Sequence, residues 1–384
     1  MDLKLGLENF LEHHVNEYKG KRIGLVTNMT GVDHRLTPTI DLFHQHPDIR
    51  LTALFGPEHG LRGDAKEGAK VGNEVDPKTG LPVYSLYSET RIPSKEMLED
   101  VDVVFFDLQD IGARYYTFIY TMANVMEACG TCGKEFVVLD RPNPINGVQV
   151  EGNLVESGFT SFVGQYPLPN RHGLTIGELA HWFKHEGHIS CDLRVIEMTG
   201  WKREQYFDQT DLFWVQPTPN TTTMDMMLLY PGTCLIEGTT LSEGRGTTKP
   251  FEYIGAPCID GYDLAKRINQ TNIPSIIARP VSFVPTYQKH MNERCEGVQL
   301  HITDRRRLKS FSTGLKVIET IAELYPKEFA FREKNEEGLD FFNLLAGTDR
   351  LKDMITNGKV DDFLEECEEL SAAFNKEAIK YHCY

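Results

Sequence analysis

Four short apolar runs in the first 140 residues constrain the fold of this chain most strongly. They lie at residues 22–27, 49–55, 101–108 and 135–139, and segments with helical character separate them. Apolar runs of this length without polar alternation are typical of strands that are buried on both faces. Strands that alternate with helices along a chain form parallel sheets covered by helices. We therefore expect an α/β fold built on a parallel sheet.

Polar residues follow each of the four predicted strands. Asn28 follows the first, Glu58 and His59 the second, Asp107, Gln109 and Asp110 the third, and Asp140, Arg141 and Asn143 the fourth. The carboxyl ends of parallel strands meet at one edge of a sheet, where ligands bind. The pattern predicts a shared polar cleft at this edge. For two of these residues a structural role is equally compatible with the sequence: Asp107 could cap a turn, and Arg141 could brace a carboxylate.

The segment FGPEHG places Glu58 beside His59 in a turn framed by Gly56 and Gly60. A carboxyl group and an imidazole at a strand end are candidates for acid–base catalysis. Tyr115 and Tyr116 offer flat faces for a sugar ring. Arg114 and Arg141 could bind a carboxylate or phosphate group. Together these residues favour hydrolysis of a polar, sugar-like substrate, with an anionic group on it as one option.

Three residues downstream have both a functional and a structural interpretation. His172 precedes a predicted helix and could act in the cleft or simply lie in a loop. Arg245, in a polar segment at 242–250, could bind an anion or remain a surface cation. Thr175 and Glu178 have the spacing of a capping box, which gives Glu178 a structural role.

The motifs of several other enzyme classes are missing from the sequence. There is no G-x-S-x-G nucleophile, no G-x-G-x-x-G fingerprint, no Walker A sequence and no H-E-x-x-H pair. Cys129 and Cys132 form the only C-x-x-C, and no second pair completes a zinc site. They follow a predicted helix that extends through Met126. We expect no cofactor, although a metal-dependent hydrolase that uses His59 with Asp107 or Asp110 remains a rival interpretation.

The pattern changes near residue 258. Residues 1–258 form the predicted catalytic domain, and residues 259–384 a smaller α+β domain in which two strands accompany amphipathic helices. Within the first domain, residues 61–93 are predicted to be a long polar loop that covers the site. Residues 3–18 are expected to form an amphipathic helix. A helix, a turn at Pro231 and a short strand are expected before residue 240.

The net charge and the cysteines indicate which partners and which cellular compartment to expect. The net charge of -16 argues against a nucleic-acid partner. The eight cysteines are scattered, which fits a reducing compartment. The first residues lack the basic and apolar regions of a signal peptide, and no stretch has the apolar length of a membrane helix. The expected location is cytoplasmic, or secreted if an export signal has been trimmed from the chain.

Eight segments occur in one order along the chain: RIGLVTNMTG, FGPEHG, DLQDIGARYYT, DRPNPING, RHGLTIGE, TPN at 218–220, YPGTCLIEGT and SEGRGTTKPFEYIGAP. In this combination they resemble the NamZ-type exo-β-N-acetylmuramidases. The resemblance implies a Rossmann-like N-terminal domain, a smaller C-terminal domain and an active-site cleft at their junction. It also implies release of N-acetylmuramic acid from the non-reducing end of peptidoglycan fragments.

The same resemblance implies roles for individual residues. The catalytic glutamate of the family maps onto Glu58, here predicted to be the general acid, with His59 and Asp110 as further catalytic candidates. The lactyl carboxylate of the substrate gives the arginines an anion to bind. The predicted substrate-binding residues are Asn28, Asp107, Gln109, Arg114, Tyr115, Tyr116, Asp140, Arg141, Asn143, Glu151, Arg171, His172 and Arg245. Asp107, Asp110, Asp140 and Glu151 are candidates for a second carboxyl group. A sugar-binding protein without catalytic activity is the remaining alternative.

Overall fold

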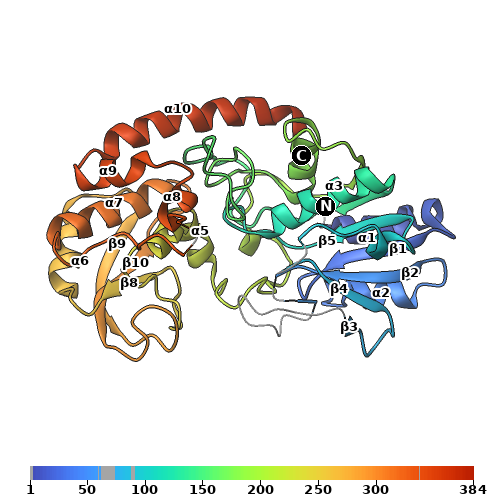
Figure 1. Cartoon of the computed structure of the whole chain (residues 1–384), viewed down its shortest axis with the longest axis horizontal. Coiled ribbons are helices and arrows are strands. Elements are labelled where there is room, and N and C mark those ends of the chain that lie inside the picture. Colours follow the sequence, from blue (N-terminus) through green and yellow to red (C-terminus); the bar gives the residue numbers. More distant parts are fainter. Residues whose placement is uncertain (1–2, 59, 62–73, 88–90, 337) are drawn as a thin grey trace.

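The computed structural model describes residues 3–58, 60–61, 74–87, 91–336 and 338–384. Two sheets organise these residues, and helices surround both (Figure 1). The larger sheet belongs to the N-terminal half of the chain and the smaller one to the C-terminal half. The division of the chain near residue 258 stays a prediction.

The larger sheet has seven strands in the order β3-β4-β2-β1-β5-β6-β7. Its strands are β1 (Arg22–Thr27), β2 (Arg50–Gly56), β3 (Glu74–Val75), β4 (Pro82–Ser85), β5 (Val103–Asp107), β6 (Glu135–Leu139) and β7 (Asp192–Ile196). All neighbours pair in parallel except the edge pair β3 and β4. The predicted α/β fold with a Rossmann-like parallel sheet is confirmed.

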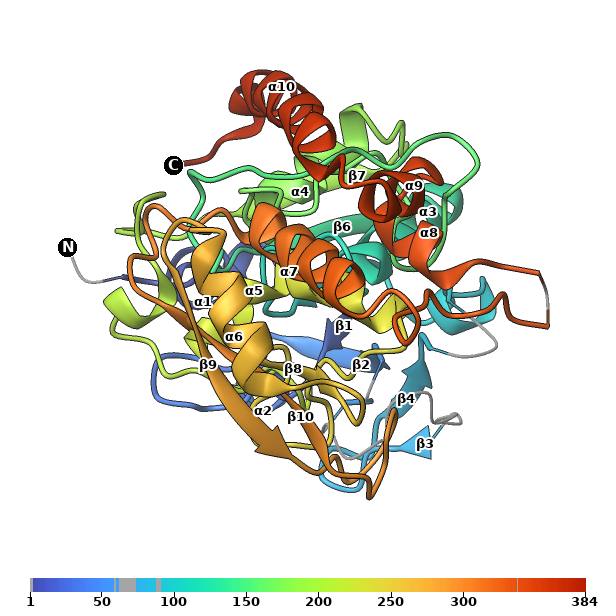
Figure 2. The same cartoon turned by 90° about the vertical axis from the view of Figure 1, so that its left-hand side faces the viewer.

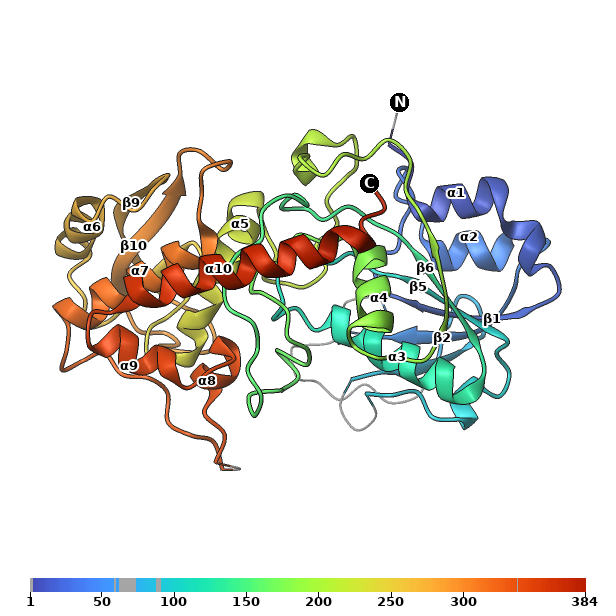
Figure 3. The ribbon, with the colours of Figure 1, turned by 90° about the horizontal axis from the view of Figure 1, so that it is seen from above.

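Helices cover both faces of this sheet (Figure 3). Because successive residues of a strand point to opposite faces, β5 contributes to two separate buried clusters. Val103 and Phe105 pack with α1 (Gly6–His13) and α2 (Thr39–Gln45). Val104 and Phe106 pack with α3 (Phe118–Cys132) and α4 (Ile176–His185). Burial on both faces explains why the strands are continuously apolar in the sequence.

The smaller sheet is antiparallel, with the strand order β8-β10-β9. Its strands are β8 (Tyr253–Ala256), β9 (Ile276–Phe283) and β10 (Cys295–Ile302). The remaining helices are α5 (Met224–Thr233), α6 (Gly261–Gln270), α7 (Ser310–Leu324), α8 (Phe341–Ala346), α9 (Arg350–Thr356) and α10 (Val360–Ala378). Helix α6 packs on this sheet and against α7 (Figure 2). None of the helices in the described ranges is both long and apolar enough to span a bilayer.

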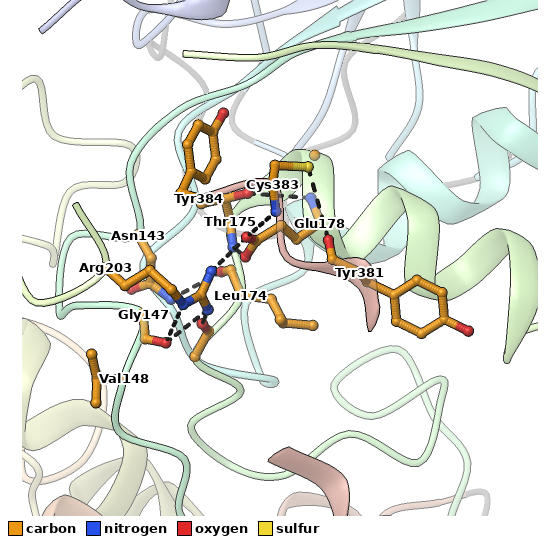
Figure 4. A network of polar contacts seen from close by, with 12 residues as sticks. Asn143, Gly147, Val148, Leu174, Thr175, Glu178, Arg203, Tyr381, Cys383 and Tyr384 are labelled. Atoms are coloured by element: carbon orange, nitrogen blue, oxygen red, sulfur yellow. Dashed lines mark hydrogen bonds and ion pairs between the residues drawn. The ribbon is translucent and has the colours of Figure 1, made fainter. Parts of the chain in front are cut away.

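Helix α10 returns from the C-terminal half to the larger sheet (Figures 1 and 3). Its acidic face is exposed, as the sequence predicts, while Phe363, Cys367 and Phe374 are buried beneath it. The last residues of the chain then bind the N-terminal half directly (Figure 4). The backbone N–H of Cys383 donates to Glu178 at 2.9 Å, and the hydroxyl of Tyr384 donates to Asp140 at 2.8 Å.

Several local predictions differ from the structure. The segment 61–93 is not wholly a loop, because β3 and β4 extend the sheet within it; residues 62–73 and 88–90 lie outside the described part of the chain. The first helix ends at His13 and is followed by a 3₁₀ turn. The C-x-x-C pair lies inside α3 rather than after it, since Gly133 is the residue that adopts the left-handed C-cap conformation.

The prediction of a turn and a strand after Pro231 is also wrong. Helix α5 continues through Pro231 to Thr233, and a 3₁₀ helix follows. Proline can occupy this position because α5 packs against α7, and the burial of apolar residues on α5 offsets the lost hydrogen bond. The 3₁₀ helices are η1 (Val15–Tyr18), η2 (Glu96–Leu98), η3 (Phe207–Gln209), η4 (Cys234–Gly238) and η5 (Ile379–Tyr381).

Asp140 makes the fold sensitive to pH. Burial raises the pKa of this carboxyl to about 7, and the nearby Glu178 adds to the effect. The folded protein therefore holds a proton on Asp140 that the unfolded chain releases near pH 4. Stability from this group is fully present below pH 4 and is lost as the pH rises to 7. The full effect is at most about 4 kcal/mol.

We predict that the Asp140→Asn variant loses this dependence. Urea unfolding of both proteins from pH 4 to 8 measures it, and the advantage of the unmodified protein over the variant should shrink as the pH rises. Asp263→Asn, an exposed substitution on α6, is the matched control. Parallel stability curves for the unmodified protein and Asp140→Asn would show that Asp140 does not titrate in this range.

Candidate active site

A cleft of about 660 Å³ lies between the two halves of the chain. The N-terminal half contributes Glu58, Tyr87, Tyr115, Tyr116, Thr117, Phe162 and Val163. The C-terminal half contributes Thr218, Pro219, Asn220, Thr221, Met226, Tyr230, Cys234, Glu237, Arg245, Phe251, Tyr287, Gln288, Phe341 and Leu345. A cleft of this size, with several aromatic side chains and a few charged groups in its lining, is typical of a binding site for a small molecule.

Glu58 follows β2 and is half-buried in the wall of this cleft. The Thr117 hydroxyl donates a hydrogen bond to its Oε2 atom at 2.9 Å. Thr117 is the residue that immediately precedes α3, so the start of this helix positions the carboxyl group. The predicted neighbour His59 lies outside the described residues.

Tyr115 and Tyr116 stand beside Thr117 in the same wall. The Tyr115 hydroxyl accepts a hydrogen bond from Asn170 and donates one to the Pro231 carbonyl at 3.2 Å. Burial raises the pKa of both tyrosines, so both hydroxyls remain protonated at neutral pH. Tyr115 thereby joins the N-terminal wall to α5 of the opposite wall.

The opposite wall carries a cluster of four charged residues. Arg245 binds Glu237 at 3.0 Å and lies 3.5 Å from Glu243, and Lys289 binds Glu243 at 2.8 Å. Burial raises the pKa of Glu237 and lowers that of Lys289. Arg245 and Glu237 both line the cleft, so this wall offers a cation and a carboxylate to a ligand.

Arg114 lies outside the cleft lining and is fully buried. Its guanidinium group donates to four backbone carbonyls, those of Asn153 and Leu168 in the N-terminal half and of Leu345 and Ala346 in α8. Arg114 therefore joins the two halves rather than facing a ligand.

The charged residues at the ends of β5 and β6 are buried, and each has hydrogen-bond partners within the protein. Asp107 is fully buried and receives two hydrogen bonds from Arg141, at 2.5 and 2.9 Å. Asp140 accepts from the backbone N–H of Gly177 at 2.7 Å, beside the capping box that Thr175 and Glu178 form at the start of α4. The structural interpretations of Arg141 and Glu178 are thus confirmed.

The other predicted residues also have protein partners. His172 Nδ1 accepts from the Leu174 N–H at 3.2 Å, so its Nε2 carries the proton and donates to Asp110 at 3.1 Å. Arg171 binds Glu151 at 3.0 Å. Asn28, Gln109 and Asn143 bind neighbouring backbone or hydroxyl groups.

Of the residues predicted from the sequence, the described cleft wall therefore contains Glu58, Tyr115, Tyr116 and Arg245. Sequence reasoning missed Glu237, Tyr287 and the segment Thr218–Thr221. Two of the segments that carry the family resemblance include some of these residues, TPN at 218–220 and YPGTCLIEGT, and they were the available signal. Among the described residues, no three His, Cys, Asp or Glu side chains converge as a metal site would require.

Comparisons with known proteins point to the same family for both halves of the chain. The model of the N-terminal domain of exo-β-N-acetylmuramidase NamZ matches residues 23–225, and the model of its C-terminal domain matches residues 228–384. The chain belongs to this family. A relative from Bacillus subtilis strain 168, the peptidoglycan β-N-acetylmuramidase NamZ, is 48% identical over 383 residues, which cover 100% of this chain and 91% of the relative.

Two crystal structures of DUF1343 family proteins from Bacteroides fragilis NCTC 9343 share the fold of this NamZ-family chain. One has a TM-score of 0.92 at 38% identity, and the other a TM-score of 0.78 at 28% identity. Each comparison covers 100% of this chain and 99% of the other. The predicted NamZ family is confirmed. The predicted fold, a parallel-sheet part together with a smaller second part, is confirmed as well.

We predict that Arg114→Met lowers stability by about 3 kcal/mol or more. The methionine fills the space but leaves buried carbonyl groups without donors. Urea unfolding measures the loss, and Arg267→Met, which removes an exposed ion pair with Glu323, should change stability by less than about 1 kcal/mol. A stability equal to that of the control variant would contradict the role given to Arg114.

Proposed function

We propose that this chain hydrolyses the β-glycosidic bond of a terminal N-acetylmuramic acid residue in peptidoglycan fragments, with Glu58 as the general acid. Membership of the NamZ family supports the reaction and makes the protein a glycoside hydrolase. The observation that carries the residue assignment is the position of Glu58 in the wall of the cleft between the two halves, where Thr117 holds its carboxyl group.

In this reaction Glu58 donates its proton to the glycosidic oxygen as the bond from C1 to that oxygen breaks. Water supplies the hydroxyl group that C1 gains and releases one proton, and Glu58 regains one proton, so the enzyme returns to its starting state. The aromatic walls formed by Tyr115, Tyr116 and Phe251 exclude bulk water around the bond. Thr117 fixes the orientation of the carboxyl group before the substrate binds, which lowers the entropic cost of reaching the transition state.

Arg245 is the proposed binding group for the lactyl carboxylate of N-acetylmuramic acid. It lies in the wall opposite the one that carries Glu58, and its guanidinium group has five N–H donors, enough for more than one acceptor. Glu237 binds Arg245 at 3.0 Å and is proposed to orient it. The carboxylate that distinguishes muramic acid from glucosamine would thus meet a preformed cation.

Contacts within the protein weigh against the rival metal site. Both oxygens of Asp107 are bound by Arg141, and one oxygen of Asp110 is bound by His172 and by the Gly112 N–H.

A reducing compartment is proposed on the basis of the eight cysteines. All of them lie in the described part of the chain and are unpaired.

We predict that Glu58→Gln lowers kcat by about 10²–10⁴-fold, the usual contribution of a general acid. Hydrolysis of a β-N-acetylmuramic acid disaccharide measures it, and ligand binding should change little because glutamine keeps the shape of the side chain. Glu99→Gln, the same substitution at an exposed site, is the control and should retain full activity.

Full activity of Glu58→Gln would refute the assignment. Unchanged binding by a protein that never turns over the disaccharide would favour the non-catalytic alternative. Loss of activity on treatment with a chelator, restored by zinc or manganese, would favour the metal-dependent one.

We predict that Arg245→Met reduces kcat/KM for the N-acetylmuramide by about 10–100-fold, the value of a charged hydrogen bond. Hydrolysis of the N-acetylglucosaminide, which lacks the carboxylate, should change far less. Arg294→Met, at an exposed position on the same half of the chain, is the control. Equal losses on both glycosides would show that Arg245 does not bind the lactyl group.

A further inference from the structure

The loop at residues 284–294 joins β9 to β10 and reaches the cleft, where Tyr287 and Gln288 belong to its lining. Three non-glycine residues of this loop, Gln288, His290 and Asn292, have φ angles between 56° and 66°. Such residues are strained in the left-handed region and persist there only where the surrounding contacts enforce the conformation. The shape of the loop therefore depends on the contacts that hold it.

Lys289 holds the middle of this loop against η4. Its Nζ atom donates to the backbone carbonyl of Ile236 at 2.9 Å and to that of Thr239 at 3.1 Å. The same atom lies 2.8 Å from the Oε2 atom of Glu243. The side chain of Lys289 is 20% exposed and that of Glu243 is 3% exposed, so this ion pair is largely shielded from water. Loss of one member would leave the charge of the other poorly compensated.

Arg245 lies between two carboxylates. Its Nη2 atom is 3.0 Å from the Oε1 atom of Glu237, and its Nε atom is 3.5 Å from the Oε1 atom of Glu243. Arg245 and Glu237 line the cleft, whereas Glu243 does not. One guanidinium group cannot neutralise two carboxylates, so these three residues alone would repel an anionic ligand. Lys289 supplies the missing positive charge without lining the cleft itself.

We propose that Lys289 is a positioning residue for anion binding in the cleft. It cancels the charge of Glu243, so the guanidinium group of Arg245 keeps a net attraction for a substrate carboxylate. The inference rests on the proposed function, because it takes Arg245 as the group that binds the lactyl carboxylate. An ion pair that only stabilised the loop would act equally on charged and uncharged substrates.

The test compares two glycosides that differ in one charge. One is nitrophenyl β-N-acetylmuramide, and the other is its lactyl methyl ester, which has nearly the same shape but no negative charge. Lys289→Met should raise KM for the acid about tenfold and leave kcat nearly unchanged, with little effect on KM for the ester. Lys266→Met, at an exposed position on α6, is the control and should change neither substrate's kinetics.

Glu243→Gln tests the sign of the effect. It removes a negative charge while glutamine still offers an acceptor to Lys289 and Arg245, so KM for the acid should fall rather than rise. The double substitution Glu243→Gln with Lys289→Met removes one charge of each sign. It should return KM for the acid to within about threefold of the value for the unmodified protein. These two variants keep the test decisive if Lys289→Met alone fails to fold.

An increase of KM for the acid in Glu243→Gln, or equal increases for acid and ester in Lys289→Met, would overturn the role of Lys289. Hydrolysis of neither glycoside by the unmodified protein would instead overturn the proposed function. Calorimetric binding of free N-acetylmuramic acid to the same variants then tests Lys289 without turnover. Weaker binding to Lys289→Met together with tighter binding to Glu243→Gln would support the role, and any other pattern would overturn it.

Discussion

The cleft depends on one buried cation. Arg114 donates to backbone carbonyls on both sides of the junction, and it directly precedes three residues that line the cleft, Tyr115, Tyr116 and Thr117. Burial lowers the pKa of its guanidinium group, yet the group is charged at any physiological pH. A buried charge that loses its hydrogen bonds is left without solvation, which costs much free energy. The carbonyl groups of the two halves are therefore held at a fixed separation around Arg114, and the cleft between the halves is preformed.

The sequence was sufficient to predict the central sheet and a cleft position for Glu58. Strands buried on both faces need continuous apolar residues, and this signal is local and strong. Glu58 follows such a strand and lies between two glycines, which is a local signal for a position at the edge of the sheet where ligands bind. The capping box of Thr175 and Glu178 is equally local and was also predictable. Short edge strands such as β3 and β4 have too few residues to show an apolar pattern, which is why the sequence of 61–93 predicts a loop.

The rest of the site required long-range information. Polar residues at neighbouring strand ends can bind a ligand or bind each other, and sequence does not distinguish these outcomes. Here Asp107 and Arg141 neutralise each other, and Asp110 pairs with His172, 62 residues away along the chain. The opposite wall comes from residues 218–345, whose approach to Glu58 depends on the packing of the two halves. Glu237 could not be placed near Glu58 without that packing.

The most direct measurement is a crystal structure of the Glu58→Gln variant with the intact disaccharide bound. The account predicts that the glycosidic oxygen lies within hydrogen-bond distance of the side chain at position 58. It also predicts the muramic acid ring in the cleft with its carboxylate at Arg245. A disaccharide bound with its glycosidic oxygen away from position 58 would contradict the account.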